Sequence, residues 1–177
     1  MRFRETLANL PPLNVFRMVA ALPESFRPFL QLGGSLLGDP AIDARIREIA
    51  ILRVAHVTNS SYEWAQHEQL GRSVGVTDAE IEAIKRDDPE GALGPEEALA
   101  CRVATEISQD VRLSDEALAL LIERYGTRGA CSLILCASYY NMVSRFLEST
   151  RVPIEDEQLL AGQTPGQFTG SRRTTGG

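Results

Sequence analysis

Residues 45–57 form the stretch that most constrains the fold of this chain. A helical wheel of the stretch is apolar most of the way round, at Ile46, Ile49, Ala50, Ile51, Leu52, Val54, Ala55 and Val57. A helix that is apolar on nearly all sides has to be buried on several of them. The rest of the chain must therefore supply other elements that pack around it.

Helical periodicity runs through almost the whole chain, and no strand-like alternation stands out. Local signals mark two helix starts: Asp39-Pro40 offers an N-cap acceptor before proline, and residues 77–80 form a capping box. Residues 87–95 are expected to be a polar loop. The expected helices span residues 14–21, 24–37, 40–57, 60–74, 77–85, 96–109, 114–124 and 127–147. The fold class is therefore all-α.

The length of 177 residues suits a single domain. We expect one helical domain over residues 1–160 and a flexible tail over residues 161–177, because the tail has little apolar surface to offset its ordering entropy. The charged first residues lack the apolar segment of a secretory signal. Cytoplasmic residence is the expectation.

Charge and hydropathy narrow the classes of partner. A net charge of −6 argues against nucleic acid or an anionic membrane as the main partner. Residues 129–144 carry no charge, but a stretch of about 16 residues is short for a bilayer span of roughly 20. We therefore expect it to be a core helix or a subunit interface, and the chain to form a homo-oligomer.

Few residues of this chain could hold a metal or carry redox chemistry. The three cysteines, Cys101, Cys131 and Cys136, form neither a CxxC pair nor a zinc cluster. A metal site built from the two histidines and a glutamate would have no recognised ligand spacing. No metal and no cofactor are expected.

Residues 60–74 place two titratable groups on an apolar arc of a helix. Glu63 and His67 share this arc with Trp64, whereas Gln66 falls on the arc expected to face solvent. A carboxylate and an imidazole four residues apart are within reach of one hydrogen bond. In apolar surroundings the pair resembles a partly desolvated acid–base couple.

Glu48 lies in the middle of the nearly all-apolar helix, where a buried glutamate needs a partner. His67 is one candidate. The arginines Arg47, Arg53 and Arg145 are others. Two buried carboxylates and one histidine in adjacent helices are difficult to explain by structural needs alone.

Structural interpretations of the same residues stay open at this point. Ser60 and Glu63 have the spacing of a capping box, which would satisfy the first backbone N–H groups of their helix. His67 could be a core histidine with its hydrogen bonds satisfied, and Glu48 could belong to a structural ion pair. His56 is expected to be structural or at the surface.

Two segments carry a resemblance to a known family: residues 47–55, REIAILRVA, and residues 59–67, NSSYEWAQH. They resemble the core of the carboxymuconolactone decarboxylase family, whose relatives include the AhpD-type alkylhydroperoxidases. Residues 14–17 and 140–146 add support, so that the resemblance covers about residues 10–155. It implies an all-helical AhpD-like bundle assembled into trimers or hexamers, with the site near a subunit interface.

The peroxidase branch of that family uses a glutamate followed by Cys-x-x-Cys-x-x-x-His. Here the glutamate maps onto Glu48, the two cysteine positions onto Ser60 and Glu63, and the histidine onto His67. A serine hydroxyl cannot be oxidised reversibly to a sulfenic acid or close a disulfide. Peroxiredoxin activity, although it often accompanies the family label, is therefore expected to be absent.

The resemblance and the residues together predict an acid–base enzyme of the decarboxylase type, a lyase, acting on a small carboxylated or lactone-type substrate. The expected catalytic residues are His67, Glu63 and Glu48, with His67 moving the proton and the two glutamates setting its tautomer and charge. The expected substrate contacts are Ser60, Tyr62, Trp64 and an arginine, Arg47 in first place, with Arg53 and Arg145 as alternatives. The competing hypothesis is a non-catalytic helical oligomer that binds a small ligand.

Overall fold

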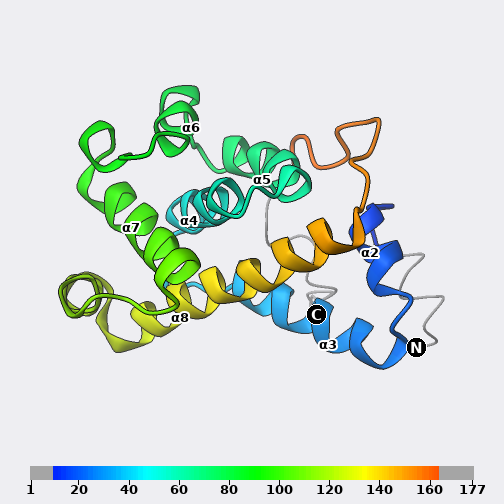
Figure 1. Ribbon diagram of the computed structural model, residues 1–177, viewed down its shortest axis with the longest axis horizontal. Coiled ribbons are helices and arrows are strands. Elements are labelled where there is room, and N and C mark those ends of the chain that lie inside the picture. The colour runs from blue at the N-terminus through cyan, green and yellow to red at the C-terminus, as the bar shows by residue number, and fades with distance from the viewer. Residues whose placement is uncertain (1–9, 164–177) are drawn as a thin grey trace, which may run out of the picture.

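The computed structural model describes residues 10–163, and within that range it contains helices and no strand (Figure 1). The expected all-α fold is confirmed. The helices are α2 (Asn14–Val19), α3 (Pro23–Leu37), α4 (Ala44–Val57), α5 (Ser61–Ser73), α6 (Asp78–Ile84), the short 3-10 helix η1 (Glu90–Ala92), α7 (Pro95–Asp110) and α8 (Asp115–Thr150).

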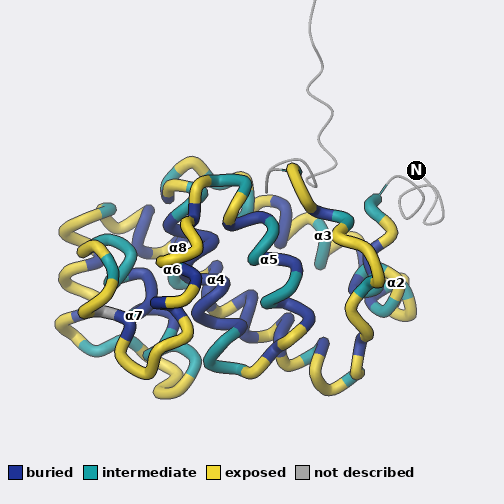
Figure 2. The backbone as a smooth tube through the Cα atoms, turned by 90° about the horizontal axis from the view of Figure 1, so that it is seen from above, coloured by how far each residue is buried: buried dark blue, intermediate teal, exposed yellow. Residues whose placement is uncertain are grey.

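Helix α4 is the centre of the bundle. Every residue from 46 to 55 is buried, including Arg47, Glu48 and Arg53 (Figure 2). Helices α5, α6, α7 and α8 all pack against it. The burial on several sides that the sequence predicts for this stretch is confirmed.

Helix α8 is a pair of helical arms joined by a break at Gly126, which has φ 65° and ψ 174°. The break falls in the gap between the two helices expected at 114–124 and 127–147. The longer second arm crosses the molecule beneath α4 and α5 and above α3 (Figure 1). Through contacts with α3, α4, α5 and α7, α8 connects the two ends of the bundle.

The expected start of α4 at Asp39-Pro40 is wrong. The helix begins at Ala44, with Asp43 as N-cap accepting from the backbone N–H of Arg45 at 2.9 Å. The carboxylate of Asp39 instead accepts from the backbone N–H of Ala41 at 2.9 Å and from the hydroxyl of Ser132 at 2.8 Å. Asp39 therefore ties the α3–α4 connection to α8 rather than capping a helix.

The segment after α8 returns to α5 and α2 (orange in Figure 1). Leu160 is buried, and its backbone N–H donates to the side-chain oxygen of Gln69 on α5 at 3.2 Å. Residues 161–163 form the end of a turn. The remainder of the tail expected at 161–177 lies outside the described residues.

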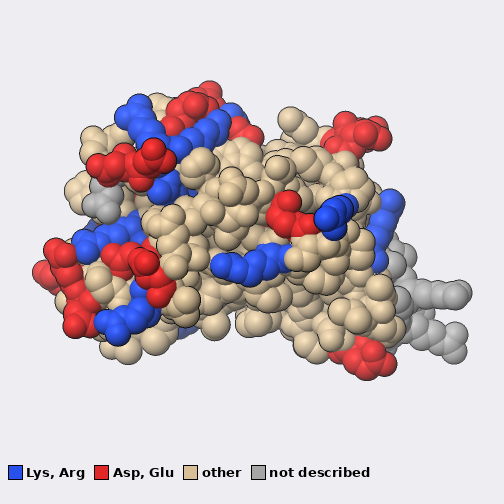
Figure 3. Space-filling view, viewed as in Figure 1, with Lys and Arg blue, Asp and Glu red and all other residues tan. Residues whose placement is uncertain are grey.

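Charged side chains are unevenly spread on the face shown in Figure 3. They gather over α6, α7 and the beginning of α8, whereas the region over α3 and the rest of α8 is mostly uncharged. On α8, Leu135 and Met142 are exposed. Within residues 10–163 no helix combines the length and the apolar character needed to cross a membrane.

The break in α8 gives a stability prediction. Gly126 has a φ and ψ that are essentially restricted to glycine, and a Cβ there would meet open space, so that a substitution brings backbone strain without a clash. We expect Gly126→Ala to lower the free energy of unfolding by about 1–3 kcal/mol in a urea titration. Gly91→Ala is the control, because Gly91 has equally open surroundings without the positive φ. Equal stability of the two variants would contradict this account of the break.

Candidate active site

A cavity of about 110 Å³ lies between α2, α3, α5, α8 and the returning C-terminal segment. Most of its wall is apolar. The apolar side chains come from Leu13, Val15, Phe16, Phe29, Leu30, Leu37, Leu70, Val143, Leu147 and Leu160. The polar side chains come from Tyr62, Glu63, Gln66, His67, Tyr139 and Tyr140. A partly open, mostly apolar cavity with a few polar groups is typical of a small-molecule site.

His67 on α5 is paired with Glu48 on α4. The Nδ1 atom of His67 lies 2.7 Å from Oε2 of Glu48, whose side chain has no exposed surface. Burial alone would lower the pKa of His67, but the Glu48 carboxylate more than offsets it, so that the pKa lies above its ordinary value. Because Nδ1 is engaged by Glu48, Nε2 is the ring nitrogen left for a ligand.

Glu63 lies one helical turn before His67 and is fully enclosed. Its Oε2 accepts a hydrogen bond from the hydroxyl of Ser144 on α8. Burial raises the pKa of Glu63 to about 8, although His67 and the Ser144 hydroxyl act in the opposite direction. At neutral pH most Glu63 side chains are therefore protonated, and the second oxygen can donate a hydrogen bond.

The hydrogen bond expected between Glu63 and His67 is not formed. Each of the two side chains takes its partner from a neighbouring helix instead, Ser144 for Glu63 and Glu48 for His67. The two groups remain electrostatically coupled across one turn of α5, because the charge of each alters the pKa of the other. One carboxylate holds the imidazole, and the other is left neutral beside it.

Two carboxylate oxygens in this cluster have no hydrogen-bond partner among the described residues. They are Oε1 of Glu48 and Oε1 of Glu63, and both are inaccessible to bulk solvent. Buried polar atoms in a structural network are normally satisfied, because each unsatisfied group costs about 1–3 kcal/mol. The described residues therefore leave one oxygen of each of these two carboxyl groups unpaired.

The capping-box interpretation of Ser60 and Glu63 is wrong. Ser60 is the N-cap residue of α5, but its side chain makes no cap hydrogen bond. Glu63 turns inward to Ser144 instead of back to the start of the helix. Ser60 is buried but does not line the cavity, so its expected contact with a substrate is not supported by its position.

The two aromatic residues expected to shape the pocket lie in different places. Tyr62 lines the cavity, where its hydroxyl donates to Oε1 of Glu155 at 2.7 Å. Trp64 does not line the cavity. Its Nε1 donates to Glu68 at 3.2 Å, and its ring packs edge to face against His56. Trp64 and His56 are thus outside the reach of a molecule in the cavity.

Gln66 is buried, which contradicts its expected place on the solvent side of α5. Its Nε2 donates to Oε2 of Glu155 at 2.6 Å. Glu155 also accepts from the backbone N–H of Asn14, so that one carboxylate joins α2, α5 and the returning segment. Glu155 was not predicted from the sequence, because a glutamate in a polar stretch after the last helix has no pattern that distinguishes it from a solvated one.

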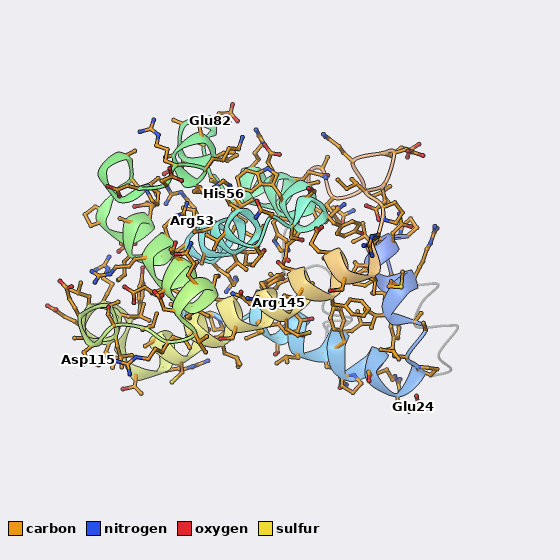
Figure 4. All side chains as sticks on the ribbon, in the orientation of Figure 1. Glu24, Arg53, His56, Glu82, Asp115 and Arg145 are labelled. Atoms are coloured by element: carbon orange, nitrogen blue, oxygen red, sulfur yellow. The ribbon has the colours of Figure 1, made fainter. Side chains whose placement is uncertain are left out.

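None of the three candidate arginines lines the cavity. Figure 4 labels two of them, Arg53 on α4 and Arg145 on α8. Each one is held elsewhere by hydrogen bonds. Arg47 donates to the carbonyls of Asp39 and Ile42, Arg53 to Thr105 and the carbonyls of Ile84 and Arg86, and Arg145 to Asn141. Arg47 is therefore not positioned to contact a substrate in this cavity. Of the described side chains that line the cavity, the one able to carry a positive charge is that of His67.

The cysteines are also outside the cavity lining. Cys101 and Cys136 are buried, whereas Cys131 is exposed. Burial raises the pKa of the Cys136 thiol well above its ordinary value, which keeps it in the unreactive protonated form. Within the described part of the chain, no group of three or more His, Cys, Asp or Glu residues could hold a metal ion.

Comparisons with known proteins bear on the family and the fold of the chain. Residues 23–106 match the model of the carboxymuconolactone decarboxylase family. A solved structure from Ralstonia eutropha JMP134, described as an alkylhydroperoxidase AhpD core and an uncharacterized peroxidase-related protein, is similar with a TM-score of 0.73 and 18% identity. The match covers 86% of this chain and 82% of the other, and it shows that the fold is AhpD-like. No curated protein matches the sequence.

The raised pKa of Glu63 predicts a pH dependence of stability. The pKa is about 8 in the folded protein against an ordinary 4.5, so that between these values the folded state holds a proton that the unfolded state has lost. The free energy of unfolding should therefore fall as the pH rises. We expect the wild type to lose about 3 kcal/mol relative to Glu63→Gln between pH 5 and pH 8 in urea titrations.

Glu68→Gln is the matched control, because Glu68 lies on the same helix but is partly exposed. Its pH profile should run parallel to that of the wild type. His67 also favours folding less as the pH rises above its unfolded pKa, in the wild type and in both variants. Because the charges of Glu63 and His67 alter each other's pKa, the difference between the wild type and Glu63→Gln contains that coupling as well as the proton of Glu63. Parallel profiles for the wild type and Glu63→Gln would show that Glu63 is ionised in the folded protein.

Proposed function

The chain carries the core of the carboxymuconolactone decarboxylase family over residues 23–106 within an AhpD-like fold, and from this premise we propose that it is an acid–base enzyme of the decarboxylase type. The observation that carries the proposal is the pair of His67 and fully buried Glu48, joined at 2.7 Å, at the wall of an apolar cavity that Glu63 also lines. The proposed substrate is a small carboxylated or lactone-type molecule.

Glu48 and His67 have different roles in proton transfer. Glu48 holds Nδ1, which fixes the orientation of the imidazole ring and favours its protonated form. Nε2 of His67 then delivers a proton to the substrate. In decarboxylation the bond between the carboxylate and its carbon breaks, carbon dioxide leaves, and the electron pair stays on the substrate until His67 protonates that carbon. His67 regains its proton from solvent.

Glu63 has the complementary role of a neutral hydrogen-bond donor. Its protonated carboxyl can donate to the substrate oxygen on which negative charge develops during the loss of carbon dioxide. Glu63 keeps its proton because burial raises its pKa more than His67 and the Ser144 hydroxyl lower it.

The apolar cavity wall supports the same chemistry. A substrate carboxylate entering it would exchange water for apolar side chains, with the His67 imidazolium as its cationic partner. The charge spreads as carbon dioxide forms, so that the loss of solvation is smaller for the transition state than for the bound carboxylate. Removal from water therefore favours decarboxylation.

Thiol peroxidase chemistry is the less favoured alternative. Ser60 and Glu63 stand at the two cysteine positions of the peroxidase pattern, and none of the three cysteines lines the cavity. A non-catalytic helical oligomer that binds a small ligand is the other alternative, and absence of carbon dioxide release would favour it. We also propose a homo-oligomer, trimer or hexamer, for which the exposed apolar residues Leu135 and Met142 on α8 are the support.

The proposal predicts a specific dependence on His67. Carbon dioxide release should be measured from a panel that contains carboxymuconolactone and simple β-keto acids, with the reaction run in D₂O so that the protonated carbon is labelled. We expect His67→Asn to lower kcat for the active member by about 10²- to 10⁴-fold, as loss of a positioned acid–base group does. Glu48→Gln should lower it by a smaller factor.

His56→Asn is the matched control, because His56 lies outside the cavity and should leave turnover unchanged. Replacement of all three cysteines by serine should also leave carbon dioxide release intact. Full activity of His67→Asn would refute the assigned role, and absence of carbon dioxide release from the whole panel would refute the decarboxylase type. Hydroperoxide turnover that depends on a cysteine would favour the thiol alternative.

A further inference from the structure

Three tyrosines line the cavity, and the protein itself uses the hydroxyls of two of them. The hydroxyl of Tyr62 donates to Glu155 at 2.7 Å and accepts from the backbone N–H of Val15 at 3.1 Å. The hydroxyl of Tyr139 donates to the carbonyl of Phe29 at 3.1 Å. The hydroxyl of Tyr140 has no hydrogen-bond partner within residues 10–163, although the residue is only 5% exposed.

Tyr140 lies beside the acid–base pair. Its ring packs edge to face against the ring of His67, with 4.8 Å between centroids. Because Glu63 is one turn from His67 on α5, the three side chains line the same part of the cavity. The Tyr140 hydroxyl is not one of the fully buried, unpaired polar atoms of the described residues, so it keeps some accessible surface at the wall of the cavity. An accessible hydroxyl that no described residue binds, next to a reactive group, favours a contact with a ligand.

The side chains of Tyr140, Glu63 and His67 can all act as hydrogen-bond donors. Burial raises the pKa of the Tyr140 hydroxyl well above its ordinary value, so that it keeps its proton. Glu63 in its protonated form is a donor as well, and Nε2 of His67 is a donor when the ring, whose pKa the Glu48 carboxylate raises, carries its second proton. A molecule that accepts hydrogen bonds from all three side chains must present acceptor oxygens. At least one of these oxygens should be uncharged, because the donors Tyr140 and Glu63 are uncharged.

The size and charge of the cavity limit that molecule further. A cavity of about 150 Å³ in another protein is known to hold benzene, so that about 110 Å³ suits a single five- or six-membered ring. Among residues 10–163 no lysine or arginine lines the cavity, and His67 can balance one negative charge. A second or third carboxylate would be buried without a partner, which is costly.

We propose that Tyr140 is a substrate-contacting residue whose hydroxyl donates to the carbonyl oxygen of a compact cyclic ketone or lactone that bears at most one carboxylate. This inference rests on the proposed function and specifies its substrate class. With the carbonyl β to the carboxylate, the electron pair left by carbon dioxide moves onto the carbonyl oxygen as an enolate. Tyr140 and Glu63 stabilise that oxygen until His67 protonates the carbon.

The test is a binding titration that needs no turnover. Cyclopentanone is the probe, followed by ligand-observed proton NMR, with cyclopentane as the ring without an acceptor and tricarballylate as the compound with three carboxylates. We expect the wild type to prefer cyclopentanone to both. Tyr140→Phe should raise the Kd for cyclopentanone about 3- to 10-fold, the loss of one neutral hydrogen bond, and should leave that for cyclopentane unchanged.

Tyr125→Phe is the matched control, because Tyr125 is another tyrosine of α8 and does not line the cavity. The melting temperature of Tyr140→Phe should equal or exceed that of the wild type, since no hydrogen bond within the described residues is lost. A variant with a lower Tm and weaker binding of both rings would show a packing role and overturn the proposal.

Three other results would also overturn it: an unchanged Kd in Tyr140→Phe, no binding of cyclopentanone to the wild type, or preferred binding of tricarballylate. Failure of this inference is distinguishable from failure of the proposed function. An unchanged Kd in Tyr140→Phe together with His67-dependent release of carbon dioxide rejects only the contact with Tyr140. Full activity of His67→Asn rejects the acid–base function even where Tyr140 binds the ring.

Discussion

The pairing of Glu48 with His67 is the interaction on which the rest of the structure depends. Glu48 lies on a helix whose residues 46–55 are all buried, and an ionised carboxyl group there is tolerable only with a partner. His67 satisfies it at 2.7 Å, which requires α5 to lie along α4 in one register. Helix α8 then closes the other side through Ser144, and the cavity forms where α2 and α3 cover the remaining gap.

This arrangement gives chemically similar groups different properties. Glu48 faces a histidine, whereas Glu63 faces a hydroxyl, so that burial keeps the second carboxyl protonated near neutral pH. The same contrast separates the tyrosines of the cavity wall. Tyr139 is bonded to the backbone of α3, and Tyr140 has its hydroxyl left for a ligand. In both cases the neighbouring helix, and not the residue type, decides what the side chain can do.

Sequence patterns predicted helices better than they predicted the roles of single residues. Ser60-x-x-Glu63 and Thr77-x-x-Glu80 have the same capping-box spacing, yet only the second pair forms one. Glu63 can find a buried partner in Ser144, whereas Glu80 lies near the surface. Likewise Asp39 accepts a hydrogen bond from Ser132 on α8, and Asp43 is the N-cap of α4 instead. Contacts between distant parts of the chain overrode the local signal in each case.

The sequence by itself determined the all-helical fold, the central position of residues 46–55 and the candidate group of Glu48, Glu63 and His67, because hydrophobic periodicity and residue spacing are local properties of the chain. Only the tertiary structure decided which partner each of these takes, and that the candidate arginines are bound elsewhere. It also decided that Glu155 and Tyr140 belong to the cavity region. Those outcomes depend on which helices meet, and at which register, and no spacing within one helix encodes that.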